Sequence, residues 1–184
     1  MLGAAMPIES AQAPPGEIER IFRDHHGMVY RAAYRITGNP SDAEDVLQTV
    51  FLRLLRRDSA AEAVGNMPSY LHRAAVNSAL DLMRSRQTAR SVPLEDAAPD
   101  LVENASLAPD RVHSSAETRK WLRGAVARLS PQAAEIFALR FFEGKENNEI
   151  AEIVGTTLGT VAVTLSRSRD RIEKEFRAYQ GEKS

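Results

Sequence analysis

Several basic side chains lie near the C-terminus. They follow a run of small and apolar residues whose spacing predicts two helices joined by a turn. In the run from Glu146 to Leu165, the small Ala151 stands where two crossing helices would touch. Gly155 follows, where the turn between such helices needs a positive φ. Thr157 is placed to cap a second helix that would begin near Leu158. The same helix carries the basic residues Arg167, Arg169, Arg171, Lys174 and Arg177.

Two interpretations fit this segment. A helix-turn-helix would place the second helix in a major groove of duplex DNA, where arginines and backbone amides at the helix start hold phosphates. An ordinary helical hairpin would leave the same charges solvated, and the interleaved Asp170, Glu173 and Glu175 are typical of such a face. We favour the DNA-binding interpretation, although the pattern alone indicates no gene or process.

A second candidate face combines an aromatic ring, an amide and guanidinium groups. Tyr70, Arg73, Asn77, Asp81 and Arg84 are three or four residues apart and share one side of a predicted helix. Such side chains can stack on unpaired bases and hydrogen-bond to them. The alternative is that the tyrosine belongs to the core and the others form a solvated face. Taken without further context, the residues favour that alternative.

The preceding predicted helix has an outer face formed by Asp42, Asp45, Gln48 and Leu52. Acidic residues in a first turn are explained by the helix dipole alone. A leucine on this face is less expected and indicates a surface for a partner. The inner face is predicted to comprise Ala43, Val46, Leu47, Val50, Phe51, Leu54 and Leu55.

Helical periodicity predicts the elements that position these faces. Gly38-Asn39-Pro40 ends a first helix, and Ser41 with Glu44 predicts a capping box that starts the second. A third helix follows Met67-Pro68 and ends near Arg86. Long helices with short connections predict a compact N-terminal bundle. Since no segment shows the alternation of a strand, the predicted fold class is all-α.

The helical pattern stops between Thr88 and His113, where three prolines and a net charge of −3 predict a flexible linker. A second capping box, Ser114 with Glu117, predicts where the helices resume. The predicted organisation is a disordered tail over 1–15, a helical bundle over 16–87, the acidic linker over 88–113 and a helix-turn-helix domain over 114–179.

The composition limits the function classes. The 184 residues include 24 basic and 25 acidic side chains, a net charge of −1, so any nucleic-acid contact depends on local patches. There is no cysteine, which excludes disulfides and thiolate metal sites. The four histidines form no HExxH motif and there is no glycine-rich phosphate loop, so we expect no catalytic site, metal or cofactor. Neither a secretion signal nor an apolar run of membrane length is visible, which predicts a cytoplasmic protein.

Three blocks of the sequence occur in a specific order. DAEDVLQTVFLRLLR (42–56) is followed by YLHRAAVNSALDLMRSR (70–86) and by LSPQAAEIFALRFFEG (129–144), with EIAEIVG and TVAVTLSRSRDRI after it. They closely resemble the core-polymerase-binding helix, the −10 element helix and the −35-reading domain of bacterial RNA polymerase sigma factors of the extracytoplasmic-function (ECF) group. The resemblance covers nearly the whole chain apart from both tails. It implies a region 2-like bundle and a region 4-like helix-turn-helix domain joined by the linker.

The resemblance implies roles for the N-terminal bundle. Its second helix would dock on the coiled-coil clamp helices of the largest subunit of core RNA polymerase, with Phe51 either a contact or a core residue. Its third helix, with the loop Ala61–Asn66, would capture a base flipped from the non-template strand and so stabilise melting. The implied polymerase contacts are Asp42, Asp45, Gln48, Phe51 and Leu52, and the implied −10 contacts are Tyr70, Arg73, Asn77 and Arg84.

The resemblance also implies that the linker runs toward the RNA exit path and that the C-terminal domain packs on the β flap and reads the −35 element of promoter DNA. The family usually has basic or small polar residues after the Thr-Val of the recognition helix, whereas Ala162, Val163 and Thr164 stand here. This departure favours apolar contact with thymine methyls over guanine readout. An anti-sigma factor is a further partner that the family often has. The implied −35 contacts are Thr160, Ala162, Val163, Thr164, Ser166, Arg167, Arg169 and Arg171.

We therefore predict an ECF-type sigma factor, not an enzyme, that recognises both promoter elements and promotes melting. Two alternatives stay open. A stand-alone helix-turn-helix regulator would need tight DNA binding by the free chain, which a net charge of −1 does not favour. A polymerase-binding protein that no longer initiates is kept open by the altered recognition helix.

Overall fold

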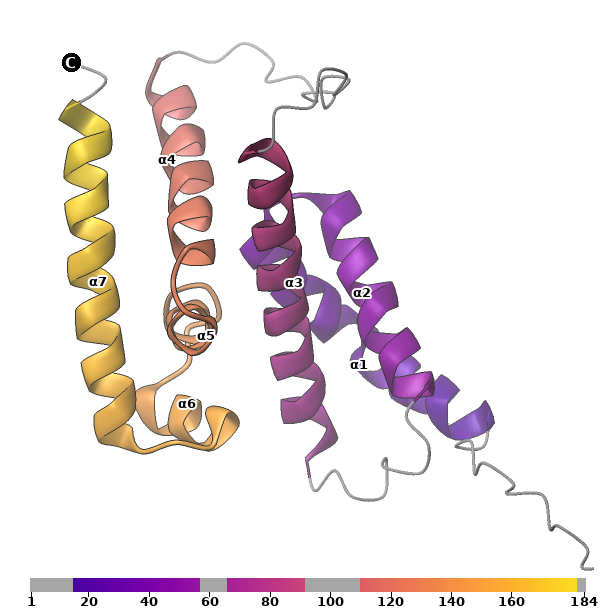
Figure 1. The fold of residues 1–184 in the computed structure, drawn as a ribbon. Coiled ribbons are helices and arrows are strands. Elements are labelled where there is room, and N and C mark those ends of the chain that lie inside the picture. The colour runs from indigo at the N-terminus through magenta and orange to yellow at the C-terminus, as the bar shows by residue number, and fades with distance from the viewer. Residues whose placement is uncertain (1–14, 57–65, 92–109, 182–184) are drawn as a thin grey trace, which may run out of the picture.

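The computed structural model describes residues 15–56, 66–91 and 110–181, and these form seven α-helices and no strand (Figure 1). The predicted all-α class is confirmed for these residues. Nearly all of the predicted tail, most of the Ala61–Asn66 loop and residues 92–109 of the predicted linker lie outside the described residues. The helices are α1 (Pro15–Thr37), α2 (Pro40–Leu55), α3 (Met67–Ser91), α4 (Asp110–Ala127), α5 (Pro131–Phe141), α6 (Asn147–Val154) and α7 (Leu158–Gly181).

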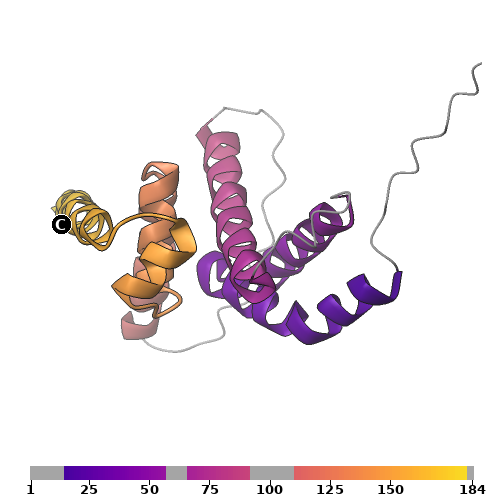
Figure 2. The ribbon, with the colours of Figure 1, turned by 90° about the horizontal axis from the view of Figure 1, so that it is seen from below.

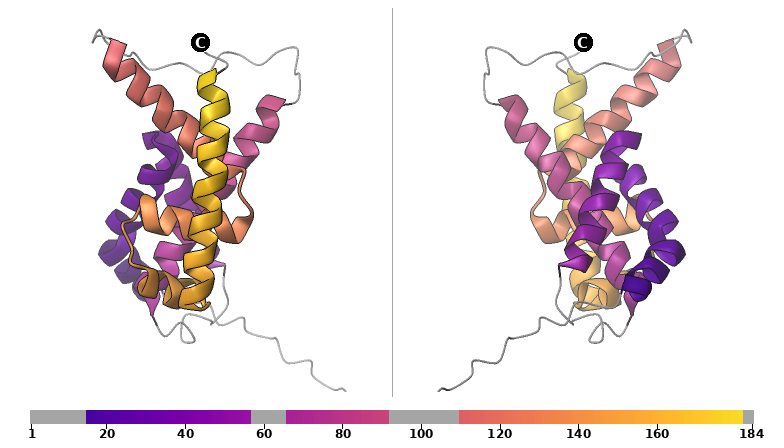
Figure 3. Two further views of the ribbon diagram at one scale, coloured as in Figure 1. Left: turned by 90° about the vertical axis from the view of Figure 1, so that its left-hand side faces the viewer. Right: turned by 90° about the vertical axis from the view of Figure 1, so that its right-hand side faces the viewer.

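Helix α3 lies in the middle of the molecule, between the other N-terminal helices and the C-terminal ones (Figure 1 and Figure 2). Helices α1 and α2 pack on one side of α3, and α4, α5 and α6 contact its other side. Side views place α7 and the pair α1 and α2 on opposite sides of the molecule (Figure 3). The residues of α3 therefore divide between the core of the bundle and an interface with the C-terminal domain. None of the helices in the described ranges is long and apolar enough to cross a membrane.

The junction between α1 and α2 is fixed by two consecutive residues. Gly38 follows α1 with a φ of +69°, a backbone conformation that favours glycine. Asn39 then caps α2, because its side-chain oxygen accepts a hydrogen bond of 3.2 Å from the backbone N–H of Asp42. The predicted capping box of Ser41 and Glu44 is wrong: the cap lies two residues earlier, and both residues are inside the helix.

The core of the N-terminal bundle consists of branched side chains from three helices. Val29 and Ile36 of α1, Val50 of α2, and Leu71 and Leu80 of α3 are at most 2% exposed and belong to one cluster of buried side chains. The cluster continues into the C-terminal helices. Burial of this apolar surface holds α3 in place, so that its remaining faces have a fixed orientation.

Helices α6 and α7 form the predicted helix-turn-helix. Gly155 has a φ of +73° directly after α6, as predicted. The hydroxyl oxygen of Thr157 accepts a hydrogen bond of 3.1 Å from the backbone N–H of Thr160, so the predicted cap of α7 is confirmed. Ile150 and Val161 are fully buried beneath the turn. The glycine at the turn and the threonine cap are thus sufficient to predict this motif from the sequence.

Helix α3 extends further into the predicted linker than its sequence pattern indicated. It continues to Ser91, whereas the pattern predicted an end near Arg86. Packing explains the difference, because Gln87 Nε2 donates a hydrogen bond of 2.8 Å to the carbonyl oxygen of Gly124 in α4. A tertiary contact of this kind holds the last turns of α3 where no local signal does.

Helix α4 begins earlier than predicted. It starts at Asp110, so Ser114 and Glu117 lie inside its first turns and the predicted capping box there is wrong. Tertiary contacts hold this helix against α7: the rings of Trp121 and Phe176 have centroids 4.9 Å apart. The start of α4 is therefore not set by the local capping signal.

Replacing Leu71 by alanine should destabilise the N-terminal bundle strongly. Leu71 is 0% exposed, so L71A loses apolar contacts and leaves a cavity, at a cost of about 2–5 kcal/mol in the free energy of unfolding. Urea denaturation measures this loss. L52A is the matched control, because Leu52 is 48% exposed and its truncation should change the free energy by less than about 0.5 kcal/mol. Equal losses in the two variants would contradict the packing.

Candidate nucleic-acid interface

The side of α3 that carries Tyr70, Arg73 and Asn77 faces the C-terminal domain. Arg73 Nε donates a hydrogen bond of 2.6 Å to Oε1 of Glu135 in α5, and Asn77 Nδ2 donates one of 3.0 Å to the same oxygen. Tyr70 and Asn77 are half-buried. The interpretation of this face as a solvated one is therefore wrong for Arg73 and Asn77, whereas Asp81 on the same face is exposed. The predicted sharing of one face is confirmed, and the face is covered by another part of the same chain.

Glu135 is an acidic residue among the buried residues of α5. Its side chain is 6% exposed, and it stands between Ala134 and Ile136, which are also buried. Burying a carboxylate costs free energy unless charged or polar donors satisfy it. Within the described residues, its hydrogen bonds come from Arg73 and Asn77, 62 and 58 positions away in the sequence. Sequence reasoning missed Glu135, and the one available signal was a charge at a core position of a predicted helix.

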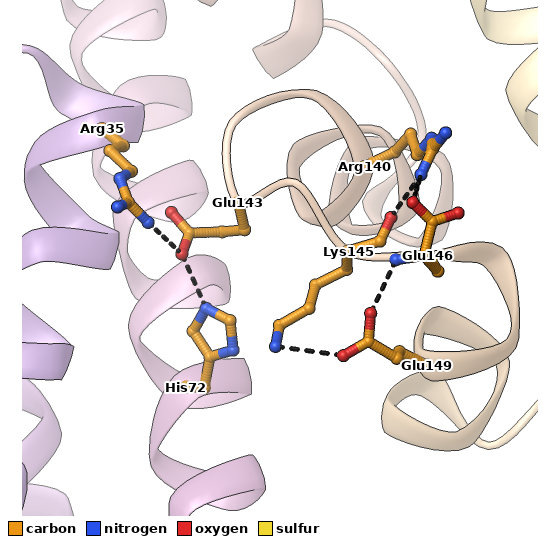
Figure 4. A network of polar contacts seen from close by, with 7 residues as sticks. All are labelled: Arg35, His72, Arg140, Glu143, Lys145, Glu146 and Glu149. Atoms are coloured by element: carbon orange, nitrogen blue, oxygen red, sulfur yellow. Dashed lines mark hydrogen bonds and ion pairs between the residues drawn. The ribbon is translucent and has the colours of Figure 1, made fainter.

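A second carboxylate, that of Glu143, lies in the turn after α5 and points toward the N-terminal bundle (Figure 4). Its Oε2 accepts a hydrogen bond of 3.1 Å from Arg35 in α1 and one of 2.8 Å from Nε2 of His72 in α3. Burial acts to raise the pKa of Glu143, but the hydrogen bond and charge of His72, together with Arg35, outweigh burial and leave this pKa below its ordinary value. The ionised form of Glu143 is thus favoured by the contact between the domains.

Two further contacts join the domains near the ends of their helices. Arg84 Nε donates a hydrogen bond of 3.2 Å to the carbonyl oxygen of Ala127. The guanidinium group of Arg123 in α4 lies against Gly38, where an added Cβ would come within 2.5 Å of its Cζ atom. Burial, followed by the charge of Arg119, lowers the pKa of Arg123. The positive φ of Gly38 therefore requires glycine, whereas an added Cβ would only displace the flexible end of the Arg123 side chain.

The outer face of α2 carries three of the five implied polymerase contacts. Asp45 and Gln48 are exposed, and Leu52 is 48% exposed. Asp42 instead is 2% exposed and forms an ion pair with Arg86 of α3. Its predicted place on the outer face is wrong, because the first turn of α2 packs against the end of α3, where a guanidinium compensates the buried carboxylate.

The burial of the aromatic and aliphatic side chains of α2 also differs in part from the prediction. Phe51 is 6% exposed and meets Phe22 edge-on, with ring centroids 4.9 Å apart, so it is a core residue. Leu55 was predicted to point inward but is 51% exposed, and Phe22 is 43% exposed. Leu55 follows Leu52 by three residues, and this helical spacing could have indicated that the two share a surface.

Helix α7, the predicted recognition helix, presents most of its implied contacts to solvent. Thr164 is half-buried. Arg171 is held by Glu175, whose Oε1 accepts a hydrogen bond of 3.1 Å from its Nε atom. The other two implied arginines make no ion pair with any residue that the structure describes. The exposed implied contacts are Thr160, Ala162, Val163, Ser166, Arg167, Arg169 and Arg171.

Two family models match the two parts of the chain. Residues 21–89 match sigma-70 region 2, and residues 119–172 match sigma-70 region 4. The first match contains α3 with its covered face and the exposed face of α2. The second contains the helix-turn-helix and both glutamates that contact the N-terminal bundle.

Individual relatives cover most of the chain. The chain is 30% identical over 171 residues to the ECF RNA polymerase sigma factor SigE of Mycolicibacterium smegmatis. The alignment covers 93% of this chain and 66% of that relative. The chain is 28% identical over 160 residues to the RNA polymerase sigma-E factor of Streptomyces coelicolor, covering 87% of this chain and 86% of the relative. A solved structure of CnrH in complex with the cytosolic domain of CnrY shares the fold, with a TM-score of 0.54 and 17% identity over 90% of this chain and 91% of that chain.

The contribution of Glu143 to stability should be lost in acid. The pKa of Glu143 is lower in the folded chain than in the unfolded one, where it is about 4.5. The contribution of Glu143 to the free energy of unfolding is therefore complete above about pH 4.5 and decreases as the pH falls through the pKa of the folded chain. The difference in unfolding free energy between the wild-type chain and E143Q should therefore be present just above this pH and shrink below it. Urea denaturation over a pH series measures the difference.

E152Q is the matched control for E143Q, because Glu152 is an exposed glutamate of α6 in the same domain. It removes the same charge without touching the contact between the domains. A difference between the wild-type chain and E143Q that stays the same in acid, or grows there, would contradict the assignment.

Proposed function

Because the chain belongs to the extracytoplasmic-function (ECF) sigma factors of the sigma-70 family, we propose that it binds core RNA polymerase, recognises the −10 and −35 elements of promoters and promotes strand separation there. The outer face of α2 binds the clamp helices of the largest subunit, α3 binds the unpaired −10 strand, and α7 reads the −35 element. The C-terminal domain docks on the β flap and the connection between the domains runs toward the RNA exit path. The protein acts in the cytoplasm and has no catalytic site of its own.

The observation that carries the proposal is the convergence of two donors on one point beside α3. Arg73 and Asn77 donate hydrogen bonds of 2.6 Å and 3.0 Å to a single carboxylate oxygen. An acceptor atom of an unpaired base, or a phosphate oxygen, fits the same position when the carboxylate leaves. Tyr70 is about one turn earlier on the same face, and its ring would stack on a base.

Strand separation then follows from binding. Extruding a base from a duplex costs a few kcal/mol, and contacts made only with the unpaired base offset this cost. The polymerase supplies further affinity by holding both domains on the promoter at once, which raises the effective concentration of each DNA contact. No nucleotide hydrolysis is required, in keeping with an initiation factor that works by binding alone.

An anti-sigma factor is included among the proposed partners. The solved structural neighbour CnrH is bound to the cytosolic domain of CnrY. A partner of this kind would act on this chain by competing for its contacts with the polymerase or between its domains. Removal of the partner would then release the sigma factor for transcription.

Mapping of transcript starts tests the proposed function directly. Core RNA polymerase from the host is combined with the purified chain and sheared genomic DNA, and the 5′ ends of the transcripts are sequenced. The proposal predicts starts that depend on the chain and share two upstream elements. Polymerase binding without new starts would favour a polymerase-binding protein that does not initiate. Selective promoter binding by the chain alone would favour a stand-alone regulator.

Truncating Leu52 should weaken polymerase binding without unfolding the chain. Because Leu52 is already about half buried, covering the rest of its side chain in an interface is worth about 0.8–1.5 kcal/mol, so L52A should bind core polymerase about fourfold to tenfold more weakly. Fluorescence titration with labelled core enzyme, without DNA, measures the affinity. L158A is the matched control, since Leu158 is 56% exposed but lies at the start of α7, on the DNA-facing helix. Wild-type affinity of L52A would contradict the assigned surface.

Removing thymine methyls from the −35 element should weaken holoenzyme binding. Val163 is 50% exposed and Ala162 is also exposed, and neither can donate a hydrogen bond to guanine. Deoxyuridine in place of thymine should therefore cost up to about 0.8 kcal/mol for each contacted methyl group, or about fourfold in affinity. Competition binding with mapped promoter fragments measures this effect.

The same substitution outside the promoter elements is the control for the uracil experiment. By contrast, R167A and R169A should weaken binding to all −35 sequences alike, because their guanidinium groups would hold phosphates. Strong dependence on a guanine opposite Ala162 or Val163, with no effect of the thymine methyls, would contradict this reading mechanism.

A further inference from the structure

The C-terminal domain covers the face of α3 to which the proposed function assigns the −10 strand. We propose that the free protein inhibits itself: Glu135 occupies the strand-binding position of α3 in place of nucleic acid, while the polymerase-binding face of α2 stays open. The inference rests on the proposed function for the meaning of the covered face. The contact itself is independent of that assignment.

Glu135 has the chemistry of a stand-in for nucleic acid. A carboxylate carries negative charge and acceptor oxygens, as a phosphate does, and it accepts hydrogen bonds from both Arg73 and Asn77. Its side chain is 6% exposed, so it excludes a strand from this position. Within the described residues, no donor from its own domain hydrogen-bonds to the Glu135 carboxylate. Its burial is therefore explained by the contact with α3.

A second ionic contact reinforces the first from the same side. Glu143 is joined to Arg35 and His72 by hydrogen bonds of 3.1 Å and 2.8 Å (Figure 4). We call the contacts of Glu135 and Glu143 with the N-terminal bundle the carboxylate latch. Both acids belong to α5 or the turn directly after it, and all their partners belong to α1 or α3. One movement of α5 away from α3 would break the whole latch.

The covered surface includes three of the four implied −10 residues, Arg73, Asn77 and Arg84. The latch begins at His72 and Arg73, one turn from the start of α3, and includes Asn77. Further along the helix, Arg84 bonds the carbonyl oxygen of Ala127 and Gln87 bonds that of Gly124. The C-terminal domain therefore occupies α3 along most of its length, and no single-stranded DNA can lie on this face in the closed form.

The other proposed binding surfaces are free in the same closed form. Asp45, Gln48 and Leu52 on α2 are exposed, and α2 is on the far side of α3 from the C-terminal domain (Figure 1). The outward side of α7, with Arg167 and Arg169, is exposed as well. The closed chain can thus meet the polymerase while its strand-binding face is blocked. Opening would follow polymerase binding, so the unpaired strand is bound only in the assembled complex.

The latch is suited to opening because its contacts are ionic. A buried ion pair adds little net stability, since the desolvation of both charges opposes their attraction. When the domains separate, the glutamates and their partners regain water, and the charges are not left buried. A partner that binds only the open form can therefore shift the equilibrium with modest binding energy.

Distance measurement between the domains tests the latch. The chain has no cysteine, so D24C in α1 and K174C in α7 provide the only two labelling sites; both positions are exposed, and neither is on the proposed polymerase-binding face of α2. Electron spin resonance of the doubly labelled full chain reports the distance between α1 and α7. We expect one narrow population in the free chain. E135Q/E143Q should add a broad population at longer distance, and so should core polymerase added to the otherwise unchanged chain.

Single-stranded DNA binding gives the second readout. E135Q/E143Q should bind a single-stranded DNA oligonucleotide of mixed sequence roughly fivefold or more tightly than the wild-type chain, because the face of α3 no longer has to be uncovered. E152Q is the matched control, as it removes an exposed glutamate of the same domain outside the latch. R35A is a second latch variant that keeps both glutamates. Because the Arg35 side chain is exposed, this substitution should leave the folding of the chain unchanged.

Several results would overturn the inference. These are a free wild-type chain with a broad distance distribution, distances in E135Q/E143Q and R35A that match those of E152Q, or unchanged binding of single-stranded DNA. The distance measurement in the free chain needs neither polymerase nor promoter. Failure of the latch would therefore leave the proposed function standing, and failure of transcription or polymerase binding would leave the latch standing.

Discussion

Glu135 sets the constraint on which the arrangement of the two domains depends. Its carboxylate is buried among apolar residues of α5, and a charge in that place must be satisfied by donors. The donors are Arg73 and Asn77 on α3, so α5 and α3 are held together. The same requirement applies to Glu143, whose Oε2 atom is satisfied by Arg35 and His72, whereas its buried Oε1 atom has no hydrogen-bond partner among the described residues. Polar compensation, together with apolar packing, therefore determines how the C-terminal domain meets the bundle.

This constraint has a direct relation to function. The side chains of α3 that suit an unpaired strand are the same ones that compensate the buried acids. They cannot do both at once, so the compact chain and the strand-bound chain exclude each other. The outer face of α2 is outside this competition. In such a factor, the unpaired strand becomes accessible only when the factor assembles on the polymerase. The ionic contacts between the domains can open at that point because breaking them costs little net free energy.

Local signals in the sequence were sufficient for the helix-turn-helix. Gly155 and Thr157 act within a few residues of themselves, and both have the predicted geometry. The shared face of Arg73 and Asn77 on α3 also followed from periodicity. Motifs of this kind are set by backbone conformation and helix pitch. They can be read without knowledge of the tertiary structure.

Features that depend on contacts between residues far apart in the sequence could not be predicted from local patterns. Asp42 was placed outside because an acid in a first turn suits the helix dipole, but Arg86, 44 residues later, draws it into a buried pair. Leu55 was placed inside, yet it is 51% exposed. The pairing of Glu135 with α3 joins residues 62 positions apart. Nothing in a local pattern indicates which of two domains covers which face.

A double-mutant cycle between Arg73 and Glu135 measures the central contact most directly. The free energies of unfolding of the wild-type chain, R73A, E135A and the double variant give the energy that couples the two side chains. The account predicts a coupling of about 0.5–3 kcal/mol, because each residue loses its main partner when the other is removed. Additive effects of the two substitutions would show that the side chains do not interact in solution, and would contradict the closed arrangement.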